Sequence, residues 1–237
     1  MNRLEAKSGP ELLAWAAARY GDAFAIGTSF QKEGMVILDM ASRLLPGGVR
    51  VFTLDTGRLP GETYTMMETV RERYGVAVEV VLPDPADVEP MVAEHGPDLF
   101  YRAPELRVLC CEARKTRPLE RKLHTLRAWA TGLRRGQSAQ RAAVPKVDTS
   151  GATVKISPLA DWTAAQVEAY IREHRVPVHP LYARGYTSIG CASCTRAVRE
   201  GEDERAGRWW WEQDGAKECG IHFSALGQVE RRRTLTA

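Results

Sequence analysis

The stretch Ala23-Phe24-Ala25-Ile26-Gly27-Thr28 begins the pattern that decides the fold. Such a short apolar run is typical of a buried strand, and the polar turn 29–34 follows it. A helix is predicted over 35–45, where Pro46-Gly47-Gly48 stops it, and a second apolar strand is predicted over 49–54. Strand, helix and strand in this order indicate two parallel strands joined by a right-handed crossover.

The same alternation continues along the chain. Further helices are predicted over 10–17, 61–74, 111–123 and 164–173, and further strands over 76–82, 127–132 and 153–157. We therefore predict an α/β fold, with a mainly parallel sheet flanked by helices. No shift in composition divides the chain, so we expect one domain over 1–223 and a polar, mobile tail over 224–237.

The composition restricts the function classes. Lysine and arginine number 33 against 30 aspartates and glutamates, which does not indicate a nucleic-acid-binding protein but allows a local cationic pocket. The polar N-terminus lacks the apolar segment of a signal peptide, and no apolar run is long enough to span a bilayer. We expect a cytoplasmic protein without membrane contact, where thiols stay reduced and serve metal or catalytic roles.

Four of the five cysteines form two pairs, Cys110-Cys111 and Cys191-x-x-Cys194, and Cys219 stands alone. Adjacent cysteines form strained disulfides and are a poor pair of ligands for one zinc ion. In an iron–sulfur cluster, by contrast, neighbouring thiolates can bind different irons, and four of them hold one [4Fe–4S] cluster. The pattern favours a cluster at these four residues, while a zinc site and buried structural thiols stay open. Cys219 is either a reactive thiol or an inert one.

Polar residues follow the predicted strands at the edge where parallel sheets bind ligands. Ser29 opens the first turn, whose following helix attracts anions with its N-terminus, and Leu54 ends the second strand before Asp55-Thr56-Gly57. Neither a dinucleotide fingerprint nor a Walker motif occurs, and plain chain reversal is the alternative for the turn. The loop after Gly132 carries arginines 134, 135 and 141, which suit either phosphate binding or a solvated surface.

Several motifs occur together and in order. They are Cys110-Cys111-x-x-x-Lys115, Leu54-Asp55-Thr56-Gly57, Gly132-Leu133-Arg134-Arg135-x-Gln137-Ser138, Cys191-x-x-Cys194, Arg205-Ala206-Gly207-Arg208-Trp209 and Lys217-Glu218-Cys219-Gly220-Ile221-His222. With them the chain resembles the assimilatory adenylylsulfate reductases, the cluster-containing branch of the phosphoadenylylsulfate reductase family. The resemblance covers about 24–223.

The resemblance implies a modified ATP-pyrophosphatase-like fold and reduction of adenosine 5′-phosphosulfate to sulfite and AMP, with thioredoxin or glutaredoxin as reductant. It implies that Cys219 is the nucleophile, which becomes an S-sulfocysteine, and that the paired cysteines bind a [4Fe–4S] cluster. The substrate is expected at Lys115, Arg205, Arg208, His222, Ser29, Leu54, Gly132, Arg135 and Arg141. The turn at Ser29 departs from related ATP-using enzymes because it lacks their Gly-Gly-x-Asp motif, which fits a substrate with one phosphate and one sulfate.

The cysteine count itself predicts an external reductant. With four thiols committed to iron, Cys219 has no partner in the chain, so a dithiol protein must release the sulfite. Lys115, four residues after Cys111, is expected on the same helix face, where it could couple the cluster to the substrate's sulfate. Three alternatives stay open: the 3′-phosphorylated nucleotide as substrate, an ATP-dependent cluster-bearing sulfur-transfer enzyme, and a sensor without catalysis. Homo-oligomerisation is also left open.

Overall fold

The computed structural model describes residues 2–45, 47–138, 141–212, 222–223 and 229–230. Its main feature is a six-stranded sheet in the order β3-β2-β1-β4-β6-β5. The strands are β1 (Phe24–Gly27), β2 (Arg50–Leu54), β3 (Val78–Val81), β4 (Ala128–Ala130), β5 (Val147–Asp148) and β6 (Val154–Ile156). All neighbours pair in parallel except β5, which is antiparallel to β6. The predicted mainly parallel sheet is confirmed; β5 was not predicted because two residues are too short to show a periodicity.

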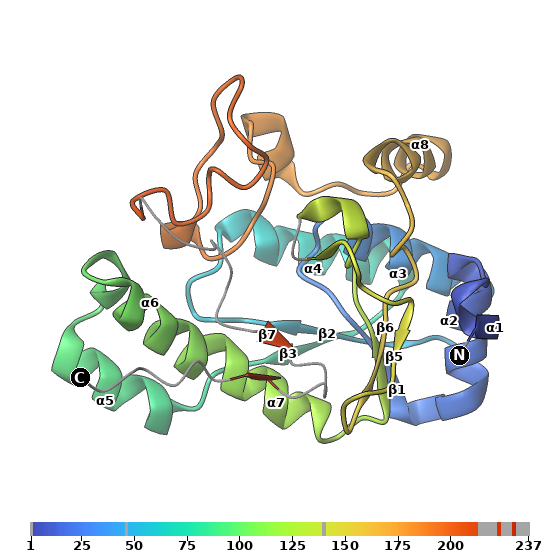
Figure 1. Cartoon of the computed structure of the whole chain (residues 1–237), viewed down its shortest axis with the longest axis horizontal. Coiled ribbons are helices and arrows are strands. Elements are labelled where there is room, and N and C mark those ends of the chain that lie inside the picture. Colours follow the sequence, from blue (N-terminus) through green and yellow to red (C-terminus); the bar gives the residue numbers. More distant parts are fainter. Residues whose placement is uncertain (1, 46, 139–140, 213–221, 224–228, 231–237) are drawn as a thin grey trace.

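Helices cover both faces of this sheet (Figure 1). One face carries α2 (Gly9–Tyr20), α3 (Lys32–Leu44), α4 (Gly61–Tyr74) and α8 (Ala164–His174), and the other carries α5 (Pro85–His95), α6 (Pro104–Cys111) and α7 (Arg117–Leu123), with the short α1 (Asn2–Glu5) near the N-terminus. Among the described residues, no helix combines the length and the apolar character needed to cross a membrane.

Three apolar clusters hold these layers together. The largest lies between the sheet and the first group of helices, and contains Ile26 and Ile37, both fully buried. A second one, around Phe52 and Trp129, packs the opposite face against α7. The third lies beyond the sheet and joins α5 and α6 to Trp209 and to three of the paired cysteines, Cys110, Cys191 and Cys194. The third cluster therefore connects the helix that carries Cys110 with the segment that carries Cys194.

The helix with the adjacent cysteines differs from its prediction. The pair ends α6 instead of opening a helix over 111–123, and a π-helical turn over Glu112–Thr116 joins α6 to α7. In this turn the Arg117 amide donates to the Glu112 carbonyl, five residues back. Pro118 explains the wide turn, because proline has no amide hydrogen to donate to the carbonyl four residues earlier. The α-helical spacing assumed between Cys111 and Lys115 therefore does not apply.

The segment 185–212 arches over the carboxyl edge of the sheet (Figure 1). Its two arms meet in an isolated β-bridge between Thr195 and Arg208, and the Trp209 amide donates to the Cys194 carbonyl at 3.2 Å. The buried His179 precedes it and contacts Thr63 of α4, with 3.1 Å between Nε2 and Oγ1. Hydrogen bonds thus order the segment. One short 3-10 helix, Pro180–Arg184, leads into it, and another, Ala192–Cys194, lies within it.

Candidate active site

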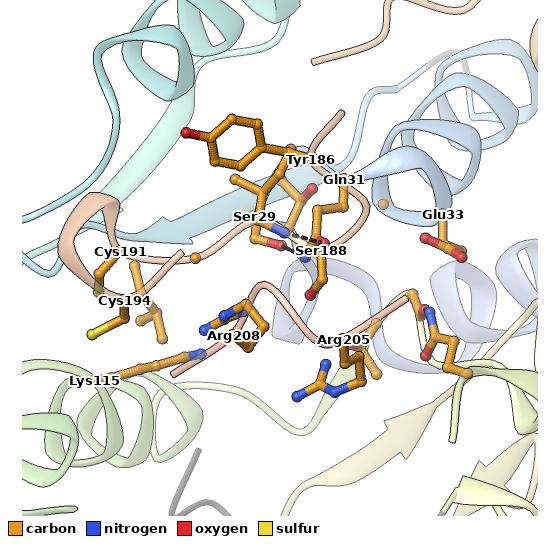
Figure 2. A pocket seen from close by; sticks show the side chains of 18 of the residues that line it. Ser29, Gln31, Glu33, Lys115, Tyr186, Ser188, Cys191, Cys194, Arg205 and Arg208 are labelled. Carbon is orange, nitrogen blue, oxygen red and sulfur yellow. Dashed lines mark hydrogen bonds between the residues drawn. The ribbon is translucent and has the colours of Figure 1, made fainter. Parts of the chain in front are cut away.

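A cavity of about 640 Å³ opens at the carboxyl ends of β1, β2 and β4. The chain leaves β1 toward β2 and β3 and returns to β4 on the other side of β1, so the cavity lies at the switch point where such sheets bind ligands. Its walls are the turn after β1, the cysteine-bearing helix, the loop after β4 and the segment 185–212. Figure 2 shows side chains from these elements around one space.

The turn between β1 and α3 forms one end of the cavity. Phe30 has a left-handed backbone, φ 57°, and its amide donates to Thr28 Oγ1 at 2.9 Å. Gln31, the N-cap of α3, makes no capping hydrogen bond; its side chain accepts from the Ile189 amide at 3.0 Å instead and donates to Ser29 Oγ at 3.0 Å. The α3 N-terminus thus faces the cavity and is tied to the arching segment. This geometry suits an anionic group.

Cations at this end have carboxylate partners. Lys32 pairs with Glu168 of α8 and lies over the ring of Tyr182. Arg134 Nε donates to Glu33 Oε1 at 2.7 Å, and this pair is largely buried, with side-chain exposures of 5% and 13%. A buried ion pair of this kind compensates its own charge, so Arg134 does not offer a free cation for phosphate.

In the loop after β4, Gly132 and Arg141 line the cavity and Arg135 does not. Gly132 lines the cavity, and a Cβ there would lie 2.9 Å from the Glu33 side chain, so only glycine fits. Gln137 connects the loop, donating to the Gly132 carbonyl at 3.2 Å and accepting from Arg141 at 2.7 Å; Arg141 lines the cavity. Arg135 is not among the lining residues, because its guanidinium bonds the Val144 carbonyl and Glu5. Leu54 and Ser29 line the cavity.

All four paired cysteines line the opposite end of the cavity. Cys110 and Cys194 are buried, and Cys191 Sγ lies 3.2 Å from Thr56 Oγ1. Burial raises the pKa of Cys110, and burial with the neighbouring Cys191 raises the pKa of Cys194 to about 12. These thiols are therefore protonated at neutral pH unless a metal takes the place of the proton.

Two observations test whether this end fits an iron–sulfur group. Trp209 Nε1 and Arg208 Nε are buried without a hydrogen-bond partner in the described chain, and both residues lie beside Cys194. Donors of this kind satisfy the sulfurs of a bound cluster. Across the described ranges, no three Cys, His, Asp or Glu side chains are arranged to hold a single metal ion. The four thiols line one end of the cavity, and four thiolates are the ligand set of one [4Fe–4S] cluster.

The predicted cations meet at the same end. Lys115, from the π-helical turn, and Arg208, from the arching segment, extend toward each other below Cys191 and Cys194, and Arg205 follows along the same wall (Figure 2). Arg208 is 6% exposed and its guanidinium lies 4.6 Å from the Trp209 ring centre. A cationic wall beside the cysteines suits the sulfate end of a nucleotide.

Sequence reasoning missed several lining residues. Arg107 belongs to no motif in the sequence; it is buried in the wall and pairs with Glu212 at 2.5 Å. Tyr182, whose hydroxyl lies 3.4 Å from the Lys32 amide, gave no signal, because tertiary packing alone brings it there. Arg114 lies between Cys111 and Lys115, where its position in the cysteine motif could have indicated a role; its Nη1 donates to the Thr56 carbonyl at 3.0 Å.

The side chains of two further predicted residues, Cys219 and His222, are not described by the structure. Cys219 lies outside the described residues, as does the tail except for 229–230. His222 belongs by its backbone to β7 (His222–Phe223), which pairs with β8 (Val229–Glu230). Their roles stay predictions.

Comparison with known proteins gives the chain's relatives. The family model of the phosphoadenosine phosphosulfate reductase domain matches residues 23–197. The adenosine 5′-phosphosulfate reductase of Burkholderia cepacia is 47% identical over 221 residues, which cover 92% of this chain and 87% of that protein. The enzyme of the same name from Allochromatium vinosum is 48% identical over 204 residues, or 85% and 79% of the two chains.

Solved structures agree with this relation. A phosphoadenylyl-sulfate reductase from Candida auris in complex with phosphate is 30% identical, with a TM-score of 0.67 over 81% of this chain and 93% of that one. An FMN adenylyltransferase from Candida glabrata in complex with ATP has a TM-score of 0.54 at 14% identity, over 80% and 60% of the two chains. The second likeness concerns the fold alone and confirms the predicted ATP-pyrophosphatase-like architecture.

Proposed function

This chain belongs to the phosphoadenosine phosphosulfate reductase family, as an oxidoreductase acting on sulfur, and we propose that it reduces adenosine 5′-phosphosulfate to sulfite and AMP. Relatives with this name at 47% and 48% identity, over most of both chains, carry the proposal. The cavity supports it, because an anion-attracting helix N-terminus lies at one end and cations lie beside thiols at the other. The reaction serves sulfate assimilation, and we expect it in the cytoplasm.

We propose that Cys110, Cys111, Cys191 and Cys194 hold a [4Fe–4S] cluster. Their four thiols at one end of the cavity, beside partnerless buried N–H groups, support this assignment. When bound, the cluster would supply a fixed charge distribution near Lys115. We infer that this charge positions and polarises the sulfate of the substrate and that the cluster passes no electrons to it. A change in its oxidation state during turnover, seen by EPR or Mössbauer spectroscopy, would contradict that role.

The first half-reaction uses Cys219 as nucleophile. Its thiolate attacks the sulfur of the phosphosulfate, the S–O bond to phosphate breaks, and AMP leaves with that electron pair. Cys219 then carries the sulfonate. Lys115, Arg205 and Arg208 offset the repulsion between the thiolate and the substrate and stabilise the charge that moves onto AMP. One such interaction at about 4 Å contributes about 4 kcal/mol at an effective dielectric near 20.

The second half-reaction needs two electrons from outside the chain. A thiolate of a dithiol protein attacks the Cys219 sulfur and displaces sulfite, which leaves a mixed disulfide. The second thiol of that protein then attacks the mixed disulfide, regenerates the Cys219 thiolate and leaves the reductant oxidised. We propose that this protein is thioredoxin, and glutaredoxin is the alternative. Comparing the rates of sulfite release with the two reductants distinguishes them.

The 3′-phosphorylated nucleotide is a second candidate substrate, since the Candida auris relative is a phosphoadenylyl-sulfate reductase. The pairing of Lys32 with Glu168 and of Arg134 with Glu33 argues against it, because neither cation is left uncompensated for another phosphate. The ratio of kcat/KM for the two nucleotides decides this point. We expect the unphosphorylated form to be favoured.

The substitution Cys219→Ser tests the function. The variant should form no sulfite and release no AMP from adenosine 5′-phosphosulfate, because a serine hydroxyl is a far weaker nucleophile than a thiolate. It should keep AMP binding and the visible absorption of the cluster, which serve as controls for folding. Peptide mass analysis of the unsubstituted enzyme after mixing with substrate alone should find one added SO3 on Cys219. Finding that mass on another cysteine, or on none, would overturn the mechanism.

A further inference from the structure

Two exposed aromatic side chains stand at the cysteine end of the molecule, outside the cavity. Tyr101 and Trp210 are 44% and 38% exposed, and neither lines the cavity. Their rings pack around Trp211, with centroids 4.5 Å and 4.8 Å from it, and Phe100 lies buried beneath. We call these four residues the aromatic platform. The platform is a cluster of packed aromatic rings, of which Tyr101 and Trp210 are exposed.

The platform is fixed to the cysteine-bearing elements. The Tyr101 hydroxyl donates to the Ser193 carbonyl at 2.9 Å, within the Cys191-x-x-Cys194 turn. Glu212, which directly follows the platform, pairs with Arg107 of α6 at 2.5 Å, and both side chains are less than 10% exposed. Breaking a buried pair of this kind is strongly unfavourable, so the chain is anchored at Glu212.

The anchor limits where Cys219 can be. Cys219 follows Glu212 by seven residues, and a fully extended chain spans at most about 3.6 Å per residue. The Cys219 Cα therefore lies within roughly 25 Å of the Glu212 Cα, and its sulfur lies at most the length of one side chain beyond that limit. Any protein that brings a thiolate to this sulfur must place part of its surface in the same neighbourhood.

We propose that the aromatic platform is the docking surface for the dithiol protein that removes the sulfonate from Cys219. This inference rests on the proposed function and adds where the reductant binds. A standard contact covers about 800 Å² on each partner, roughly 16 Å in radius, which is comparable to the reach of Cys219 from its anchor. Tyrosine and tryptophan supply large contact areas at little cost in side-chain entropy and dominate the binding energy of many interfaces.

The test separates the two half-reactions in the full-length enzyme. Trp210→Ala is compared with the unsubstituted protein and with Leu44→Ala, which removes a side chain of similar exposure, 43%, at the C-terminal end of α3. Three rates are measured: AMP release in one turnover without reductant, sulfite release from the isolated S-sulfonated enzyme by thioredoxin, and the same release by dithiothreitol. A small thiol needs no docking surface, so its rate reports on access to Cys219 alone.

We expect Trp210→Ala to lower the second-order rate with thioredoxin about 10-fold, while AMP release and the dithiothreitol rate stay within 2-fold and Leu44→Ala changes none of them. A thioredoxin rate within 2-fold of the unsubstituted enzyme would overturn the inference, and so would equal losses with thioredoxin and dithiothreitol. Absence of sulfite from the unsubstituted enzyme with both reductants would overturn the proposed function itself, and this inference with it.

Discussion

The sheet core and the arching segment 185–212 are held in different ways. The core buries a continuous set of apolar side chains between β1, β4, β6 and the helices α2, α3, α4 and α8. In the segment, few apolar side chains are buried. Most of its backbone hydrogen bonds join its own residues, as from the Arg196 amide to the Gly207 carbonyl at 2.9 Å, and the Ala192 amide ties it to the Arg58 carbonyl at 2.8 Å. Burial of apolar area stabilises the fold, whereas the polar contacts fix the positions of a few charges. Substitutions should therefore affect stability in the first region and chemistry in the second.

Lys115 lies outside the segment but extends toward its Arg208, and Lys115→Gln should give the largest effect, on the chemistry alone. Loss of an interaction of about 4 kcal/mol predicts a fall of about 10³-fold in AMP release in a single turnover. The free energy of unfolding in urea should change by less than about 0.5 kcal/mol, as for other substitutions away from the core. Lys115→Arg, which keeps the charge, is the control and should lose less. A fall smaller than 10-fold in the glutamine variant would remove Lys115 from the mechanism.

Ile37→Ala should lower the stability of the fold and leave the chemistry almost unchanged. Ile37 is fully buried on α3, and truncation of such a side chain leaves a cavity that lowers the free energy of unfolding by about 2–5 kcal/mol. Below the unfolding transition, AMP release should stay within 2-fold of the unsubstituted rate. Urea titration followed by circular dichroism measures the first quantity. A large loss of rate in the folded variant would show that the two regions are not separable.

Gly190→Ala should change activity by a smaller amount at almost no cost in stability. A Cβ at this position would lie 2.3 Å from Arg208 Nη2, so the guanidinium must move. Because the end of a long side chain moves easily, we expect little change in unfolding and about a 10-fold loss in kcat/KM. Gly61→Ala, which meets no atom within 4 Å, is the matched control. Equal activity of both variants would mean that the position of Arg208 is unimportant.

His179 should give the smallest effect, as a pH dependence of stability. Burial lowers the pKa of this imidazole, with Glu62 opposing, and the ring contacts Thr63 and the Leu181 amide. The unfolded chain therefore takes up a proton near pH 6.5 that the folded chain takes up only at lower pH. Stability from this group is complete above pH 6.5 and declines below it, by at most about 1.4 kcal/mol per pH unit.

Comparing unfolding at pH 7 and pH 5 in the unsubstituted protein and in His179→Gln isolates this contribution. The variant should lose stability less steeply as the pH falls. Identical slopes in the two proteins would show that His179 does not link the protein's stability to pH.

Much of the sheet followed from local pattern. The helix predicted over about 61–74 is confirmed as Gly61–Tyr74; Pro60 precedes it, and Gly75 adopts the left-handed backbone that ends helices. The position of the ligand-binding edge, where Leu54 ends β2, followed from the parallel topology, whereas Gly132 was predicted from the family resemblance. The π-helical turn and β5 did not, because a missing amide at Pro118 and a two-residue pairing leave no periodic signal.

The features of the site also divide into those that local sequence sets and those that tertiary packing sets. The sequence by itself determined the family, the parallel α/β order and the two cysteine pairs, because these depend on residue type and short spacings. Only the tertiary structure decided that Arg135 turns toward Glu5, that Glu33 neutralises Arg134 and that Glu212 is anchored on Arg107. Those pairs join residues about 100 or more positions apart, and no local rule selects which carboxylate a given arginine meets once the chain has folded.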